Sequence, residues 1–244
     1  MKEFKGKLGT YKIVLTSDQS PTLWSEAFDE NCHSTAGAKQ ETQYVYIEGC
    51  ELLNKAQNGS IVILEVGFGA GHGLKETYEF FKTHAPQCEV YFYSLELDEE
   101  LIPWAFENLI KIPMPQKKGK LYQGKIDHFE YNILIGDARQ TVPNFQFPKL
   151  NAIFQDAFSP DKNPSLWTVE WFEMLKSISA PDVILTTYSA SSKVKKGLFE
   201  AGWSVSERPG FSGKRGSIKA DLSGKMDRNI IEKLERSPAQ ALRD

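Results

Sequence analysis

Apolar residues follow two alternating periods along most of the chain. The continuous apolar runs at residues 61–64 and 90–95 predict strands buried on both faces. Leu74, Tyr78 and Phe81 lie between them at i, i+4 and i+7, the spacing of one helix face. Further strands are expected at residues 131–135, 151–155, 183–187, 203–207 and 216–222, and further helices at 41–58, 99–110, 167–178 and 194–201. This order predicts an α/β fold whose mostly parallel sheet is covered on both faces.

The regions around this core are less regular. The opening up to Leu15 suggests a strand or hairpin, interrupted at residues 20–22. Residues 111–130 are polar and contain prolines, so we expect a mobile connection there. The end of the chain permits either a short amphipathic helix or disorder. The expected division is an N-terminal extension (1–58), a Rossmann-like core (59–222) and a C-terminal tail (223–244).

Composition restricts the class of protein. The chain has 244 residues, of which 41% are hydrophobic and 25% charged, so it can bury a full core and is not a disordered protein. Three widely spaced cysteines support neither a disulfide framework nor a thiolate zinc site, and we expect no metal. The reduced thiols and the lack of a long apolar run predict a cytoplasmic protein without membrane contact.

Charge is distributed unevenly. The formal net charge is −3, but the stretch from Lys193 onward carries +5 and residues 1–192 carry −8. The basic end is therefore the better candidate for binding a polyanion. The alternative is that Lys193, Lys195 and Lys196 form the solvated face of a helix.

A glycine-rich loop follows the first buried strand. It reads Glu65-x-Gly67-x-Gly69-x-Gly71, which brings backbone close to a ligand but does not satisfy the dinucleotide fingerprint. A carboxylate before the loop repels a pyrophosphate and suits a cationic sulfonium with an amino group. The loop therefore favours S-adenosylmethionine over NAD. Close packing of a helix on a strand is the alternative reading.

Carboxylates also stand where the next strands end. Glu96, rather than Asp98, is expected to accept hydrogen bonds from ribose hydroxyls. The alternative is that both are ordinary solvated acidic residues at a helix start. Asp137 either binds the adenine amine or caps the following helix. Asp156 opens a loop where a methyl acceptor would meet the donor, with a simple turn residue as the alternative.

The residues at these positions resemble a known family. The glycine loop, Leu95-Glu96, Gly136-Asp137 and above all the run from Asp156 to Trp167 are similar to the methyltransferase half of the MnmC enzymes, which act on the wobble uridine of certain tRNAs. The resemblance spans residues 15–222. It implies a class I S-adenosylmethionine-dependent methyltransferase fold with an N-terminal extension. The family's flavin-dependent oxidase half has no counterpart here, which implies a stand-alone methyltransferase.

The resemblance also implies a reaction and its residues. The expected reaction is methylation of the primary amine of 5-aminomethyl(-2-thio)uridine at the wobble position. Asp156 would orient the amine and accept its proton, while Phe158 and Tyr188 would shape a pocket for the base. Glu41 would add to the cofactor site. The expected contacts with the tRNA anticodon stem-loop are Lys162, Asn163, Lys195, Lys196, Lys214 and Arg215.

Two other functions remain open from the sequence alone. The first is a related enzyme that methylates another amine or transfers an aminopropyl group. The second is a non-catalytic module that binds an adenosine ligand or RNA. Retention of Asp156 and of the Lys162-Asn163-Pro164 loop argues against the second.

Overall fold

The computed structural model describes residues 2–244, and its centre is the strand β5 (Ser60–Val66). Ile61 and Ile63 pack into the core on one face of the sheet, while Leu64 and Val66 pack into the core on the other. This alternation explains the continuous apolar run, because both faces of the strand are buried. The prediction of a sheet covered on both sides is confirmed.

The large sheet has nine strands in the order β12-β13-β11-β10-β5-β6-β9-β8-β7. The five central strands, β11, β10, β5, β6 and β9, pair in parallel. The pairs on both flanks are antiparallel. The strands besides β5 are β6 (Glu89–Glu96), β7 (Gln116–Lys118), β8 (Leu121–Ile126), β9 (Phe129–Ile135), β10 (Leu150–Gln155), β11 (Ser179–Thr187), β12 (Ser204–Arg208) and β13 (Ser217–Asp221).

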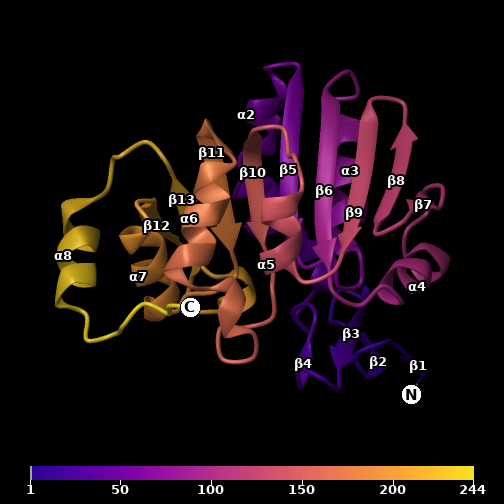
Figure 1. Cartoon of the computed structure of the whole chain (residues 1–244), viewed down its shortest axis with the longest axis horizontal. Helices are drawn as coiled ribbons and strands as arrows, with labels where there is room; N and C mark the ends of the chain where they lie inside the picture. Colours follow the sequence, from indigo (N-terminus) through magenta and orange to yellow (C-terminus); the bar gives the residue numbers. More distant parts are fainter. Residues whose placement is uncertain (1) are drawn as a thin grey trace.

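Helices cover both faces of this sheet (Figure 1). One face is covered by α2 (Leu52–Ala56), α3 (His72–His84) and α4 (Leu101–Asn108), together with the π-helix η1 (Thr42–Glu48). The other is covered by α5 (Ala138–Thr141), α6 (Val169–Ser177) and α7 (Ser192–Glu200). The remaining helical segments are α1 (Ala38–Glu41), α8 (Arg228–Arg236) and the 3-10 turns η2 (Val142–Asn144), η3 (Pro164–Leu166) and η4 (Phe211–Gly213).

A second, four-stranded antiparallel sheet precedes the core. Its strands are β1 (Glu3–Lys5), β2 (Thr10–Leu15), β3 (Pro21–Ser25) and β4 (Glu30–Asn31). Figure 1 shows this small sheet next to the ends at which the arrows of β6 and β9 finish. It therefore lies over the edge of the large sheet at which ligands bind in doubly wound folds.

Several local predictions were wrong. Residues 111–130 are not an irregular connection, because they form β7 and β8, with Tyr122 buried and a turn at Gly119 (φ +63°). The predicted helix at 41–58 is not continuous: α1 ends at Glu41, the π-helix η1 follows, and left-handed backbone at Glu51 (φ 56°) separates η1 from α2. Trp167 precedes α6 rather than opening it. Pro21 begins a strand instead of ending one.

The C-terminal tail contains the helix that the sequence left undecided. Leu234 of α8 is buried, and Lys233 forms an ion pair with Glu207 of β12. Beyond α8, the Arg243 guanidinium lies 3.1 Å from Glu170 and 2.6 Å from Glu200. The tail is therefore fixed against α6, α7 and β12.

Candidate active site

A cavity of about 330 Å³ lies at the carboxyl ends of β5, β6, β9 and β10. This volume is within the range of small-molecule sites. The large sheet and the loops after its strands supply most of the wall, and the small sheet supplies the rest. The lining residues are Leu8, Tyr11, Phe28, Cys32, His33, Val66, Gly67, Gly69, Leu95, Glu96, Leu97, Leu101, Gly136, Asp137, Ala138, Asp156, Ala157, Phe158, Asn163, Ser165 and Leu166.

The glycine loop divides into residues that line this cavity and one that does not. Gly67 has φ +101°, and a Cβ atom there would lie 2.7 Å from the Asp156 carbonyl oxygen. Gly69 also lines the cavity. Gly71 is not part of the wall, since a Cβ atom there would lie 2.7 Å from Ile110 in the core. Gly71 thus serves packing, the alternative reading of the loop.

Glu96 lies on the wall of this cavity and is held there by backbone donors. Its Oε2 accepts a hydrogen bond from the Gly69 N–H (3.1 Å) and its Oε1 accepts one from the Asp98 N–H (2.8 Å). Burial raises the pKa of Glu96 to about 7, against the lowering effect of these two hydrogen bonds. The carboxyl group is therefore fixed in position and poised to change charge near neutral pH.

Asp98 binds the small sheet. Its carboxylate accepts hydrogen bonds from the backbone N–H groups of Lys7 (3.0 Å) and Leu8 (2.9 Å) and from the Tyr11 hydroxyl (3.1 Å). Asp98 thus fixes the first hairpin of the small sheet over the cavity. Of Glu96 and Asp98, only Glu96 lines the cavity.

The other predicted cofactor carboxylates lie in different places. Asp137 lines the cavity and also caps α5, because its Oδ1 accepts a hydrogen bond from the Arg139 N–H (2.9 Å). Glu65 is not on the wall: it accepts a hydrogen bond from the Ser94 hydroxyl beneath α3, and burial raises its pKa. Glu41 lines a neighbouring cavity.

This second cavity, of about 230 Å³, adjoins the first. The two share five lining residues: Cys32, His33, Asp156, Ala157 and Phe158. The residues that line the second cavity but not the first are Glu30, Asn31, Ser34, Thr35, Glu41, Tyr188 and Lys214. Three carboxylates, those of Glu30, Glu41 and Asp156, therefore face a space with one lysine. We call this space the acceptor cavity and the larger one the cofactor cavity.

Asp156 stands where the two cavities meet. It follows β10, and its Oδ1 accepts a hydrogen bond from the Tyr46 hydroxyl of η1. Burial raises the pKa of Asp156, and the Tyr46 hydrogen bond opposes this rise. Tyr46 was not predicted from the sequence. On an apolar helix face, a tyrosine whose hydroxyl reaches a site and a tyrosine that only fills the core have the same sequence pattern.

Aromatic residues fix the loop that carries Asp156. The Phe158 ring stacks on Phe28 with centroids 4.2 Å apart. The Tyr188 hydroxyl donates a hydrogen bond to the Ala157 carbonyl (2.9 Å), and the Trp167 indole N–H donates one to the Phe158 carbonyl (2.8 Å). The structure thus brings the three predicted catalytic residues, Asp156, Phe158 and Tyr188, around one cavity.

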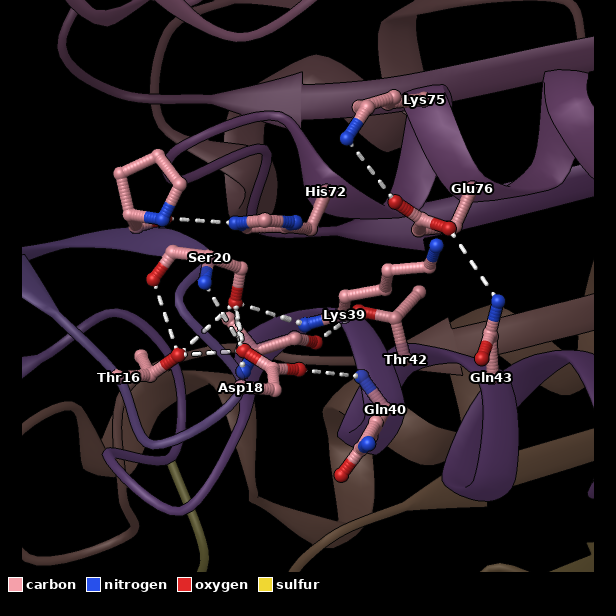
Figure 2. Close-up of polar contacts among 12 residues, drawn as sticks. Thr16, Asp18, Ser20, Lys39, Gln40, Thr42, Gln43, His72, Lys75 and Glu76 are labelled. Carbon is pink, nitrogen blue, oxygen red and sulfur yellow. Dashed lines mark hydrogen bonds and ion pairs between the residues drawn. The ribbon is translucent and has the colours of Figure 1, made fainter.

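A polar clamp holds the start of α1, the helix that ends at Glu41, to the loop between β2 and β3 (Figure 2). Asp18 and Ser20, between β2 and β3, accept hydrogen bonds from backbone N–H groups of Ala38, Lys39 and Gln40 at the start of α1. These donors have no partner within the helix, so the clamp satisfies them. Burial opposes ionisation of Asp18, but hydrogen bonds from Ser20, Thr16 and the Gln40 N–H lower its pKa to about 2.

The predicted RNA contacts are mostly engaged with the protein itself. Lys162 pairs with Asp29 (3.1 Å), Lys195 pairs with Glu207, and Lys214 pairs with Glu41 (2.7 Å). The Lys196 ammonium lies 3.4 Å from the Ser237 carbonyl. Asn163 lines the cofactor cavity. Arg215 is exposed.

Comparison with known proteins agrees with this geometry. Residues 100–223 match the family model described as S-adenosyl-L-methionine-dependent methyltransferase. The chain belongs to this family. Its cofactor is therefore S-adenosylmethionine, as the sequence predicted. The part of that prediction that rested on the carboxylate before the glycine loop was wrong in its detail, because Glu65 does not line the cavity. The residues of the cofactor cavity are compatible with that molecule, since Gly67 leaves space beside the Asp156 backbone and Glu96 holds a fixed carboxyl group on the wall.

Several relatives share the methyltransferase region. The chain is 31% identical over 224 residues to the tRNA 5-methylaminomethyl-2-thiouridine biosynthesis bifunctional protein MnmC of Leptospira interrogans, and 27% identical to that of Paraburkholderia phymatum. These matches cover 83% and 84% of this chain but 34% of each relative. The chain thus spans about a third of the length of the curated relatives it matches.

Solved structures extend the comparison. The MNMC2 protein of Aquifex aeolicus superposes with a TM-score of 0.81 at 29% identity, covering 96% of this chain and 79% of that one. Spermidine synthase from Thermotoga maritima superposes with a TM-score of 0.63 at 13% identity, which shows a shared fold alone. The expected class I methyltransferase fold is confirmed. Among residues 2–244, no helix is both long and apolar enough to cross a bilayer.

Proposed function

We propose that this methyltransferase transfers the methyl group of S-adenosylmethionine to the primary amine of 5-aminomethyl(-2-thio)uridine at the wobble position of tRNA. The observation that carries the proposal is the position of Asp156, which lines both the cofactor cavity and the acceptor cavity. The names of the relatives, which specify tRNA 5-methylaminomethyl-2-thiouridine biosynthesis, support the choice of substrate.

The acceptor cavity has the chemistry that an amine requires. Three carboxylates face it, so an ammonium group entering from water is attracted. The amine must lose a proton to expose its lone pair. Asp156, whose pKa is raised by burial, is the group placed to accept that proton and to orient the nitrogen toward the cofactor cavity. Tyr46 holds the carboxylate in position.

The cofactor supplies an electrophilic methyl group on a sulfonium, with a leaving group that needs no further activation. Gly67, Gly69 and Glu96 hold it, and Asp137 borders the same cavity. Most of the rate acceleration then comes from alignment of donor and acceptor across the junction at Asp156. Phe158 and Tyr188 provide apolar surface for a uracil ring taken out of the base stack.

The deciding experiment measures transfer of a labelled methyl group from S-adenosylmethionine to tRNA. The tRNA is isolated from cells that lack this protein, and its nucleosides are analysed before and after reaction. We expect 5-aminomethyl(-2-thio)uridine to be converted into the methylaminomethyl form. Free polyamines and a protein extract serve as competing acceptors. An unchanged nucleoside profile, or methylation of a competing acceptor in place of tRNA, would contradict the proposed substrate.

A further inference from the structure

The Lys214 side chain of this protein reaches into the acceptor cavity. Its ammonium nitrogen lies 2.7 Å from Oε1 of Glu41 and 5.7 Å from the centroid of the Tyr188 ring. An ammonium held between a carboxylate and the face of an aromatic ring is a recognised arrangement for binding organic cations. Lys214 therefore occupies a complete cation site within the cavity.

Glu41 is prepared for a cation independently of Lys214. The residue is only 5% exposed, at the point where α1 passes into η1. Its Oε2 accepts a hydrogen bond from the Ser34 N–H (2.8 Å), which leaves Oε1 directed at the cation. A buried carboxylate without a positive partner is costly, so this site favours an occupying cation.

The side chain of Lys214, in contrast, is only partly enclosed by the site. Its side chain remains 41% exposed, and it follows η4, a turn in which Ser212 and Gly213 both have positive φ (49° and 79°). A long, flexible side chain anchored on an exposed turn can turn outward without disturbing the core. The fixed partner is Glu41, and the exchangeable partner is Lys214.

We propose that Lys214 occupies the binding site of the acceptor's ammonium group while no acceptor is bound. When the acceptor binds, its ammonium group takes over the contacts with Glu41 and Tyr188 and displaces Lys214 toward solvent. The inference rests on the proposed function in one respect, namely that the acceptor is a primary amine. Lys214 is then a specificity-determining residue, because an acceptor without a positive charge cannot replace it at Glu41. The displaced ammonium is free to meet a phosphate of the substrate.

The displacement also bears on the proton-accepting group. Burial raises the pKa of Asp156, and the positive charge of Lys214 is among the influences that lower it. While Lys214 occupies the site, it supplies the one positive charge among three carboxylates that line the cavity. The acceptor ammonium supplies the same charge until it gives up its proton.

The test uses benzylammonium, which carries an aminomethyl group on a flat ring, and benzyl alcohol as its neutral counterpart. Both are titrated calorimetrically, at constant ionic strength, into the protein saturated with S-adenosylhomocysteine. We expect Lys214→Met to bind benzylammonium at least about fivefold more tightly than the wild type, with no change for benzyl alcohol. The additional substitution Glu41→Gln should abolish this gain.

The control is Lys219→Met, which removes a lysine–glutamate ion pair of the same kind, with Glu51, on β13. It should bind benzylammonium as the wild type does. The proposal is overturned if Lys214→Met gains nothing, or if it gains equally for benzyl alcohol, because then only space has been freed.

A second measurement uses the wild-type protein. Acetylation of Lys214 by acetic anhydride, followed by peptide mass spectrometry, should become faster relative to acetylation of Lys219 when benzylammonium saturates the protein; the comparison with Lys219 corrects for the anhydride that benzylamine itself consumes. An unchanged ratio of the two rates contradicts displacement. Neither measurement involves tRNA, so a failed methyl transfer to tRNA with a successful benzylammonium test refutes only the proposed substrate, and the reverse result refutes only the role of Lys214.

Discussion

The hydroxyl of Tyr46 donates a hydrogen bond to the carboxylate of Asp156, although the two residues are 110 positions apart. Removing this hydrogen bond with Tyr46→Phe should raise the pKa of Asp156, because the ionised carboxylate loses a donor. We expect the acidic limb of the pH profile of kcat/KM to move upward by about one pH unit. Tyr44→Phe is the control, since that hydroxyl bonds the Pro209 carbonyl instead. Superimposable profiles for Tyr46→Phe and the wild type would contradict the assignment.

Asp156→Asn should separate chemistry from binding. The amide keeps the size of the side chain but accepts no proton, so we expect kcat for methyl transfer to fall about 10²- to 10⁴-fold. The Kd of S-adenosylhomocysteine should change by no more than about threefold, because Gly67, Gly69 and Glu96 are intact. Single-turnover methyl transfer and calorimetry provide the two numbers. A variant with normal turnover would remove Asp156 from the mechanism.

Binding of S-adenosylhomocysteine should depend on pH through Glu96. The pKa of Glu96, about 7, lies above the ordinary value of 4.5, so its carboxylate forms only as the pH rises through 7. We expect this ionised form to accept the hydrogen bonds from the ribose hydroxyls. Affinity should fall about tenfold from pH 8 to pH 6. Glu96→Gln should bind more weakly and show a flatter pH dependence. His33 does not contribute in this range, because burial lowers its pKa well below the ordinary value. A pH-independent wild type would refute this role for Glu96.

Arg215 should contact RNA phosphate. It is exposed beside the acceptor cavity, one residue after Lys214. We expect Arg215→Ala to weaken tRNA binding and to reduce the slope of log K against log salt concentration by about one. Lys195→Ala should have a smaller effect, since that lysine already pairs with Glu207. Lys125→Ala, on the opposite flank of the sheet in β8, is the control. Identical slopes for all four proteins would count against a phosphate contact at Arg215.

Asp18→Asn should loosen the clamp between the small sheet and α1. We expect the free energy of unfolding at pH 7 to fall by about 1 kcal/mol, because hydrogen bonds to an ionised acceptor are lost. The folded-state pKa of Asp18, about 2, lies below the ordinary 3.8. Its stabilising contribution is therefore present above pH 3.8 and disappears as the pH falls toward 2. Urea unfolding between pH 2.5 and 7 measures this, with Asp127→Asn in an exposed turn as the control. Parallel stability curves for wild type and Asp18→Asn would contradict the prediction.

The central strands were predictable because each is buried on both faces and leaves a continuous apolar run. The same physics places Glu96 and Asp156 correctly at the edge of the sheet, since parallel strands end together. The strands β7 and β8 were missed because they lie on the flank, where β7 is exposed and polar on both faces. These strands form by pairing next to β9, and the hydrophobic pattern of residues 116–126 by itself does not predict that pairing.

The part of the cofactor cavity wall that the small sheet supplies was not predictable from local sequence. Phe28, Cys32 and His33 line the cofactor cavity only because the small sheet folds over it. Glu41 was assigned to the cofactor by resemblance, but it lines the acceptor cavity, and Tyr46 of the following π-helix bonds Asp156. A short motif identifies a carboxylate near the site but does not show which cavity it faces.

The small sheet also affects when the site can form during folding. Its contacts join residues far apart in sequence: Lys7 to Asp98 and Glu30 to Ser159 span 91 and 129 positions. Such contacts require closure of long loops, so they form late compared with the helices and adjacent strands of the core. The segment that forms the small sheet precedes the core in the sequence but is therefore among the last parts to reach its final place. We expect the protein to bind its cofactor only after that segment has folded onto the core.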